Sequence, residues 1–120
     1  MGKYVDGFVL PVPTENVEKY RELASKAGEI WKEHGALQYI EAVGDDLEIE
    51  DMLSFKKIAG TKDDETVVFA WILFESREHR DKVNAAVMAD PRLKADMESS
   101  KDTFDFKRMA YGGFKALVEL

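Results

Sequence analysis

The residues best suited to chemistry in this sequence are two acids that alternate with aromatic residues. Asp6 lies between Tyr4 and Phe8 at the two-residue spacing that places side chains on one face of a strand. A carboxyl group on an apolar face is either paired with a cation or has a raised pKa, and raised pKa values serve acid–base catalysis. Asp6 is therefore the first candidate for a base or a ligand-orienting group. Glu41 alternates with Tyr39 in the same way, although charges at such positions also protect the edge of a sheet.

The sequence also favours one of the two states for Asp6. Arg108 and Lys115 are basic residues of the expected neighbouring strand, and either one beside Asp6 would lower its pKa. The middle of that strand holds Gly112 and Gly113, which leave space rather than charge. We therefore expect burial to raise the pKa of Asp6 above its ordinary value of about 3.9.

Two further side chains could complete a catalytic set with Asp6. Trp71 lies in the middle of an apolar run, and its indole N–H needs a partner when buried, which Asp6 or a ligand could supply. His79 begins an apolar helical face and could act as a general base. Packing in the core is the alternative for both residues. His34, at the end of a predicted helix, is better explained as a capping residue.

Polar and aromatic side chains near this set are expected to line a ligand site. These residues are Tyr4, Phe8, Glu41, Phe69, Asn84 and Tyr111. We predict no metal site, because the sequence has no cysteine and no His-x-x-x-His spacing. The acidic clusters at 45–51 and 63–65 lack the spacing of a calcium loop and indicate solvated loops. No cofactor can be named from these patterns.

Hydrophobic periodicity and capping residues predict the elements that position these side chains. Strands are expected at 4–12, 37–43, 66–74 and 107–119, and helices at 15–34, 76–89 and 92–97. Thr14 and Ser76 are expected N-caps, and Gly35 ends the first helix. The stretch from 44 to 66 is expected to be irregular, with a short extended piece at 54–58.

The element order β-α-β-β-α-β is that of an α+β, ferredoxin-like domain spanning residues 1–120. The sheet order would be 4-1-3-2, antiparallel, with both main helices on one face. However, strand 66–74 is apolar on both faces, so a monomer would expose a large apolar patch. We therefore predict a homodimer in which two sheets face each other and close a barrel.

The charge excludes several classes of partner. Lys and Arg total 17 against 24 Asp and Glu, a formal net charge of −7, which disfavours nucleic acids and anionic membranes. The longest apolar run, 67–74, has only eight residues and is far too short to span a membrane. The segment 2–6 has no signal-peptide apolar region, so we expect a cytoplasmic location.

Several motifs together resemble the YbaA-like family of small bacterial proteins of unknown function. They are YVDGF at 4–8, WKEHGAL at 31–37, DDETVVF at 63–69, and the segments 79–92 and 107–114. The resemblance implies the dimeric α/β-barrel superfamily. Some members of that superfamily oxidise haem or polyphenols with a polar residue on strand one, a Trp on strand three and a His on helix two. Asp6, Trp71 and His79 occupy the analogous elements here.

These observations leave three hypotheses for the function. The first is a homodimer that binds a small apolar or aromatic ligand, without catalysis. The alternative is a monooxygenase-type enzyme that acts on haem or a polyphenol, an expectation that comes from analogy of fold. The third, an RNA-associated protein, is disfavoured by the charge.

Overall fold

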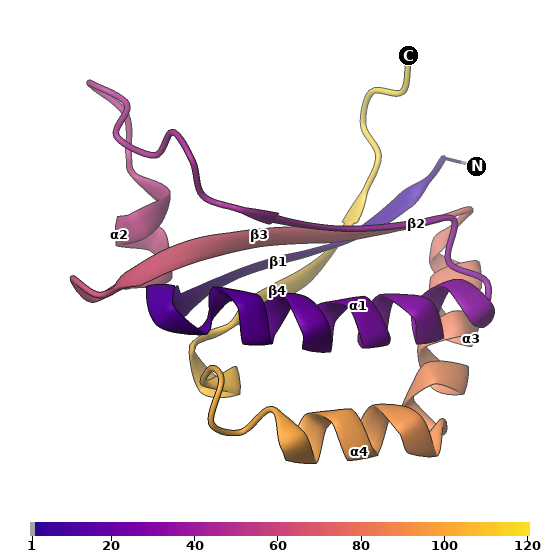
Figure 1. Cartoon of the computed structure of the whole chain (residues 1–120). Helices are drawn as coiled ribbons and strands as arrows, with labels where there is room; N and C mark the ends of the chain where they lie inside the picture. The colour runs from indigo at the N-terminus through magenta and orange to yellow at the C-terminus, as the bar shows by residue number, and fades with distance from the viewer. Residues whose placement is uncertain (1) are drawn as a thin grey trace.

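The computed structural model describes residues 2–120, and its elements follow the predicted order (Figure 1). The strands are β1 (Tyr4–Pro13), β2 (Gln38–Val43), β3 (Glu65–Phe74) and β4 (Ala110–Lys115). The helices are α1 (Val17–Glu33), α2 (Phe55–Ala59), α3 (Arg77–Met88) and α4 (Pro91–Ser99). Short 3₁₀ turns at Thr14–Asn16 and Phe106–Arg108 precede α1 and β4.

The four strands form one antiparallel sheet in the order β2-β3-β1-β4, which confirms the predicted ferredoxin-like arrangement. In this register Asp6 lies opposite Ile72 of β3 and Gly113 of β4, and Ile72 lies opposite Tyr39 of β2. Residues directly opposite each other point to the same face of a sheet. Figure 1 shows α1 and α4 stacked on one side of the sheet, while the tail after β4 rises on the other.

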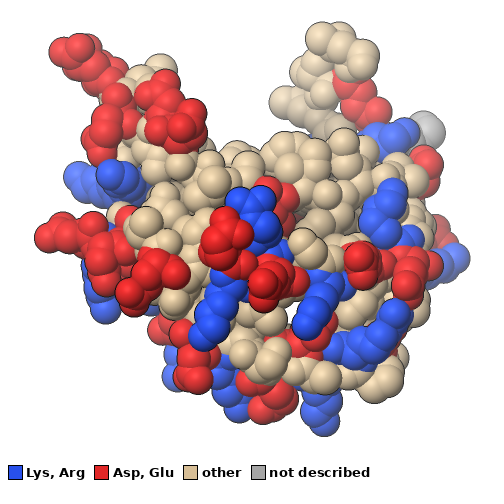
Figure 2. All heavy atoms as spheres, viewed as in Figure 1, with Lys and Arg blue, Asp and Glu red and all other residues tan. Residues whose placement is uncertain are grey.

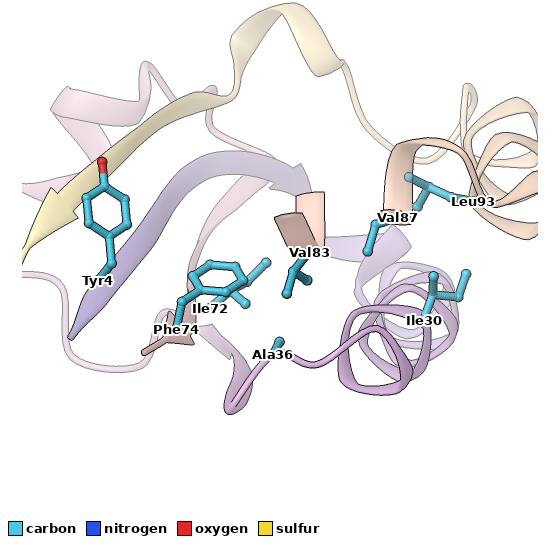
Figure 3. Packing of buried hydrophobic residues seen from close by; sticks show 8 residues of the cluster. All are labelled: Tyr4, Ile30, Ala36, Ile72, Phe74, Val83, Val87 and Leu93. Carbon is cyan, nitrogen blue, oxygen red and sulfur yellow. The ribbon is translucent and has the colours of Figure 1, made fainter. Parts of the chain in front are cut away.

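The core lies between the sheet and the helices (Figure 3). Ile72 and Phe74 of β3 pack with Val83 and Val87 of α3 and with Ile30 of α1. A second cluster, around Leu10, Val12, Tyr20 and Val68, fills the space at the far end of β1. Each Å² of apolar surface removed from water stabilises the folded state by about 25 cal/mol, so these two clusters make the main favourable contribution to folding.

The other face of the sheet has no helix layer and is apolar. Phe69 of β3 is 43% exposed and packs on Phe55 of α2, with the ring centroids 5.9 Å apart. Trp71 packs edge-on against Phe69, with the ring centroids 5.8 Å apart, and Phe114 of β4 is 62% exposed on the same face. In Figure 2 the upper surface between the two projecting segments is a hollow formed by uncharged residues.

The prediction for residues 54–58 was wrong, because this segment is helical. The Ser54 side chain accepts a hydrogen bond from the N–H of Lys56, which makes Ser54 the N-cap of α2. Gly60 then closes the helix in the left-handed conformation, with φ of 66°. Ser and Gly six residues apart are the two ends of a one-turn helix, which is too short to show a helical periodicity of apolar residues.

Two other details differ from the sequence-based expectation. Thr14 does not cap α1 with its side chain; its backbone N–H donates to the carbonyl of Asp64 at 2.9 Å. Strand β4 begins later than predicted, because Asp105 caps a 3₁₀ turn just before it through the N–H of Lys107, and it ends at Lys115 instead of residue 119. Ser76, by contrast, is confirmed as the N-cap of α3, and its side chain accepts from the N–H of His79 at 3.1 Å.

Candidate functional site

A cavity of about 320 Å³ lies between the sheet and the helix layer. Phe8 and Ile72 line it from the sheet, Trp31 from α1 and Leu93 from α4. The segment that joins α4 to β4 closes it with aromatic residues, including Phe104. An apolar cavity of about 150 Å³ is large enough for one benzene ring. This cavity can therefore hold one or two fused rings.

Asp6 sits in the wall of the cavity and is only 1% exposed. The Nε of Arg80 donates to one carboxylate oxygen at 3.1 Å, and the Nδ2 of Asn84 donates to the other at 3.5 Å. Arg80 and Asn84 are one helical turn apart on α3, so both reach the same carboxyl group. Burial raises the pKa of Asp6, while Arg80, Asn84 and Tyr111 oppose that rise. The direction is the one expected from the sequence.

Arg80 also joins Asp6 to the aromatic residues around it. Its Nη2 donates to the hydroxyl of Tyr4 at 3.2 Å, and its guanidinium lies 4.9 Å from the centre of the Tyr4 ring. On the other side of the cluster, the indole Nε1 of Trp31 donates to Asn84 Oδ1 at 3.3 Å. The cluster therefore connects β1, α1 and α3 through side-chain hydrogen bonds.

Gly113 makes this arrangement possible. A β-carbon at this position would collide with the Arg80 guanidinium and with the hydroxyl of Tyr4. The expectation that the two glycines leave space without charge is therefore wrong, since the guanidinium occupies the space above Gly113. Arg108, one of the two cations considered for Asp6, instead binds Glu65 at 2.7 Å and lowers its pKa to about 2.

Glu41 forms a second carboxyl cluster in the wall of the same cavity. The hydroxyl of Tyr20 donates to one of its oxygens and the hydroxyl of Tyr39 donates to the other. Burial raises the pKa of Glu41, the two phenols oppose that rise, and the pKa values of both tyrosines are raised as well. The edge-protecting role considered for Glu41 does not apply, because its side chain points between the sheet and α1. Gly28 of α1 leaves room for the Tyr39 ring.

The cavity brings together five of the predicted site residues and leaves others elsewhere. Its lining includes Asp6, Phe8, Glu41, Asn84 and Tyr111. The rings of Phe8 and Tyr111 lie 4.9 Å apart. Within residues 2–120 no group of three or more potential metal ligands is found, and no helix could cross a membrane.

Trp71 and Phe69 lie on the opposite face of the sheet from Asp6. The indole Nε1 of Trp71 donates to Gln38 Oε1 at 3.3 Å, so Asp6 is not its partner as the sequence had suggested. The register gives the reason: Asp6 is opposite Ile72, which puts the even-numbered residues of β3 on the cavity side. Asp6 and Trp71 of one chain therefore cannot share a site.

The two histidines lie at the ends of helices, outside the lining of the cavity. The Nδ1 of His79 accepts from the N–H of Glu75 at 3.0 Å, and its ring packs edge-on against Phe74. His34 does more than end α1: its Nε2 lies 2.9 Å from Oδ2 of Asp90, the N-cap of α4. Both contacts hold chain segments together.

Three residues with polar contacts at the site were not among the predicted site residues: Tyr20, Trp31 and Arg80. Tyr20 and Trp31 lie on the apolar stripe of the predicted helix 15–34, a position typical of core packing, and the structure shows that their polar atoms bind Glu41 and Asn84. The spacing of Arg80 and Asn84, four residues apart, is a signal for one helical face. Only the fold shows that this face points at Asp6.

The family described as "Protein of unknown function (DUF1428)" matches residues 3–106. The chain belongs to this family. It is 43% identical over 117 residues to the uncharacterized protein YbaA of Escherichia coli (strain K12), with 98% of each chain covered, which confirms the predicted resemblance.

Comparison with solved structures shows the same fold at low sequence identity. SnoaB, a cofactor-independent oxygenase from Streptomyces nogalater solved as a point mutant, matches with a TM-score of 0.64 at 12% identity, covering 100% of this chain and 98% of that one. A dimeric ferredoxin-like protein of unknown function from Thermobifida fusca matches with a TM-score of 0.51 at 12% identity, covering 97% and 93%. These matches establish the architecture of the DUF1428 chain as that of the ferredoxin-like α/β proteins.

Proposed function

We propose that the protein binds a small, mainly aromatic molecule in the cavity between the sheet and the helices. The observation that carries this proposal is the cavity itself, with about 320 Å³ of space, aromatic walls and two polar clusters. Ligand sites in proteins commonly combine an apolar lining with a few fixed polar groups that orient the ligand. Phe8, Trp31 and Tyr111 provide the aromatic walls, and the Asp6 and Glu41 clusters provide the polar groups.

The two tryptophans allow this proposal to be tested by fluorescence. Trp31 lines the cavity and Trp71 lies on the other face of the sheet, so Trp71→Phe leaves a single tryptophan that reports on the cavity. We expect 2-naphthylmethanol, a neutral two-ring probe, to change the Trp31 signal with saturation. The matched variant Trp31→Phe should show a much smaller change, because its remaining indole is remote from the ligand.

A pair of leucine variants locates the binding. Ala27 of α1 lines the cavity, so Ala27→Leu should reduce the volume and weaken binding at least tenfold, whereas Ala85→Leu on the exposed side of α3 should not. The proposal fails if no neutral one- or two-ring probe binds with saturation. It also fails if the two leucine variants weaken binding equally.

We also propose that two copies pair through the face of the sheet that has no helix layer. Phe69 and Phe114 are exposed there, and soluble monomers rarely expose continuous apolar patches of this kind. The similar fold of a dimeric protein from Thermobifida fusca supports the same arrangement. Light scattering at micromolar concentration should give twice the chain mass of 13.6 kDa. Phe69→Glu should give the monomer mass, and Ala85→Glu should not; a monomer mass for the unaltered chain rules the dimer out.

A cofactor-independent oxygenase is the second candidate function, and the fold match to SnoaB favours it. The base would be Asp6, because Trp71 and His79 do not line the cavity. A cavity for one or two rings suits a polyphenol better than the four pyrrole rings of haem. Oxygen uptake in the presence of 1,8-dihydroxynaphthalene tests this candidate, and Asp6→Asn should abolish the uptake. If the compound binds and no oxygen is consumed, binding alone is the function.

Binding of RNA is not part of the proposed function. Figure 2 shows Lys and Arg scattered among Asp and Glu over the visible surface, without a continuous basic stripe. With a formal charge of −7, we expect no sub-micromolar RNA affinity at about 0.15 M salt. A filter-binding titration at two salt concentrations checks this expectation. We further propose a cytoplasmic location, which cell fractionation tests.

A further inference from the structure

The charged residues that line the cavity are all acids. Three acids line it, Asp6, Glu41 and Asp96, and among the described residues no Lys, Arg or His does. Asp6 is compensated from behind by Arg80, at 3.1 Å. Glu41 takes part in no salt bridge within residues 2–120, and its two partners are neutral phenols. Two of the three acids, Glu41 and Asp96, therefore take part in no salt bridge among the described residues, and Glu41 is the one held in place by two side-chain hydrogen bonds.

Two cations that share a groove with Glu41 have other partners. Arg21 and Lys32 of α1 line a second groove, between α1 and strand β2, and Glu41 also lines this groove. Arg21 binds Glu18 at 3.0 Å, and Lys32 donates to the carbonyl oxygen of Leu37 at 2.8 Å. Neither is within salt-bridge distance of Glu41, so neither balances its charge.

The geometry at Glu41 suits a donor from the cavity. Each carboxylate oxygen has two lone pairs, and each accepts only one phenol hydrogen bond here, from Tyr20 or from Tyr39. The second lone pair on each oxygen is available to a ligand. Tyr39 and Trp31 also lie beside this position, with ring centroids 6.1 Å apart. Aromatic faces attract cations, most strongly when water is excluded.

We propose that the ligand of this cavity is an aromatic amine whose ammonium group binds Glu41 and whose ring lies against Phe8, Trp31 and Tyr111. This inference rests on the proposed ligand-binding function and specifies the chemical class of the ligand. An ammonium group supplies both the hydrogen-bond donors and the positive charge that Glu41 lacks. A carboxylate or phosphate in the same place would face Glu41 and Asp96 without a cation to offset them, so anionic ligands are excluded.

Three probes with the same ring system separate charge from shape. They are 2-naphthylmethylamine, 2-naphthylmethanol and 2-naphthoate, each titrated against the whole protein by calorimetry at pH 7. The amine should bind at least tenfold more tightly than the alcohol. The naphthoate should bind at least tenfold more weakly than the alcohol, because its charge repels the acidic lining.

Two variants assign the head group to one carboxyl. In Glu41→Gln the affinity for the amine should fall to that for the alcohol, while the affinity for the alcohol should change by less than threefold. Glu22→Gln is the matched control, because Glu22 is an exposed carboxyl group of α1 outside the cavity, and there the amine should keep its advantage. Circular dichroism confirms that each variant is folded, and if Glu41→Gln does not fold, the affinity ratios of the three probes on the unaltered protein still decide.

The outcomes separate this inference from the proposed function. If the alcohol binds as tightly as the amine, the cavity is a ligand site but the amine class is wrong. If the amine keeps its advantage in Glu41→Gln, or loses it equally in Glu22→Gln, the assignment to Glu41 is wrong. If none of the three probes binds, the ligand-binding function fails, and this inference fails with it.

Discussion

Two carboxyl groups on one face of one sheet have opposite surroundings in this protein. Asp6, on the inner strand β1, is buried against Arg80, so its charge has a cationic partner. Glu41, on the edge strand β2, is held by Tyr20 and Tyr39, so its charge has hydrogen bonds but no cation. Burial raises the pKa of both. The comparison shows that the helix residue packed against each acid, Arg80 of α3 or Tyr20 of α1, decides whether the acid has a cationic or a neutral partner.

The strongest test of this comparison removes the cation. Arg80→Met should lower the free energy of unfolding by about 3–5 kcal/mol, because it leaves the buried Asp6 charge without its partner. Urea denaturation at one fixed protein concentration measures the effect. Arg77→Met on the same helix is the control: Arg77 is exposed and its contact with Asp81 is 3.9 Å long, so it should cost less than about 1 kcal/mol.

A double variant decides whether the loss comes from Asp6. In Arg80→Met with Asp6→Asn, most of the lost stability should return, since no buried charge remains to be compensated. If Arg80→Met costs no more than Arg77→Met, Asp6 does not depend on Arg80. The contrast between the two carboxyl clusters then disappears.

Much of the fold could be predicted from the sequence, because its signals are local. Alternation of apolar residues indicated the strands, and Ser76 marked the start of α3. The existence of α2 was missed because its helix signal is only one turn long. Asp6 was found because a carboxyl group between two aromatic residues breaks a local pattern. Its partner Arg80 is 74 residues away, and no local pattern connects the two.

The faces of the sheet were harder to predict than its order. Alternation shows that Trp71 and Ile72 point to opposite sides of β3, but not which of them shares a side with Asp6. That depends on the register between β1 and β3, where a slip of one residue exchanges the two faces. The structure pairs Asp6 with Ile72. The edge-protecting alternative for Glu41 fails for a related reason, since α1 packs over the strand that the sequence predicts to be an exposed edge, and Tyr20 of α1 binds Glu41.

The next largest effect should come from a glycine beside the Asp6 cluster. Gly113→Ala should cost about 1–3 kcal/mol, because the added methyl group would displace the Arg80 guanidinium and the Tyr4 hydroxyl. Gly112→Ala is a matched control on the adjacent residue, where a β-carbon meets only the Phe114 ring at 3.7 Å, an ordinary contact. Thermal unfolding of the two variants measures the difference. Equal losses would mean that the Arg80 cluster can move aside freely.

At the Glu41 cluster, removal of one phenol donor should have a smaller effect. Tyr20→Phe keeps the ring that packs edge-on against Phe104, with centroids 5.2 Å apart, and removes only the hydroxyl that binds Glu41. The expected loss is about 1 kcal/mol, the usual contribution of one hydrogen bond. The pKa of Glu41 should rise further, because one of the groups that favours its charged form is gone. NMR titration of the glutamate carboxyl carbons in both proteins tests the direction; a fall in the pKa contradicts it.

The smallest effect at neutral pH should come from Glu41→Gln, in contrast to the loss expected from Arg80→Met. The amide can still accept from one tyrosine, and the variant removes a buried charge that has no cation, so the free energy of unfolding should change by less than about 1 kcal/mol at pH 7.

The raised pKa of Glu41 also determines the direction in which stability changes with pH. Because the folded pKa of Glu41 lies above its ordinary value of 4.5, the folded state binds the proton more tightly than the unfolded chain. Its contribution to stability is therefore full at low pH and is lost as the pH rises through the folded pKa. Relative to Glu41→Gln, the unaltered protein should thus become less stable as the pH rises from 4.5 through the folded pKa, as measured by urea midpoints. If the unaltered protein instead gains stability relative to Glu41→Gln as the pH rises, a cation of the protein or of its dimer partner holds Glu41 as a carboxylate. The site proposed for an amine would then already be filled.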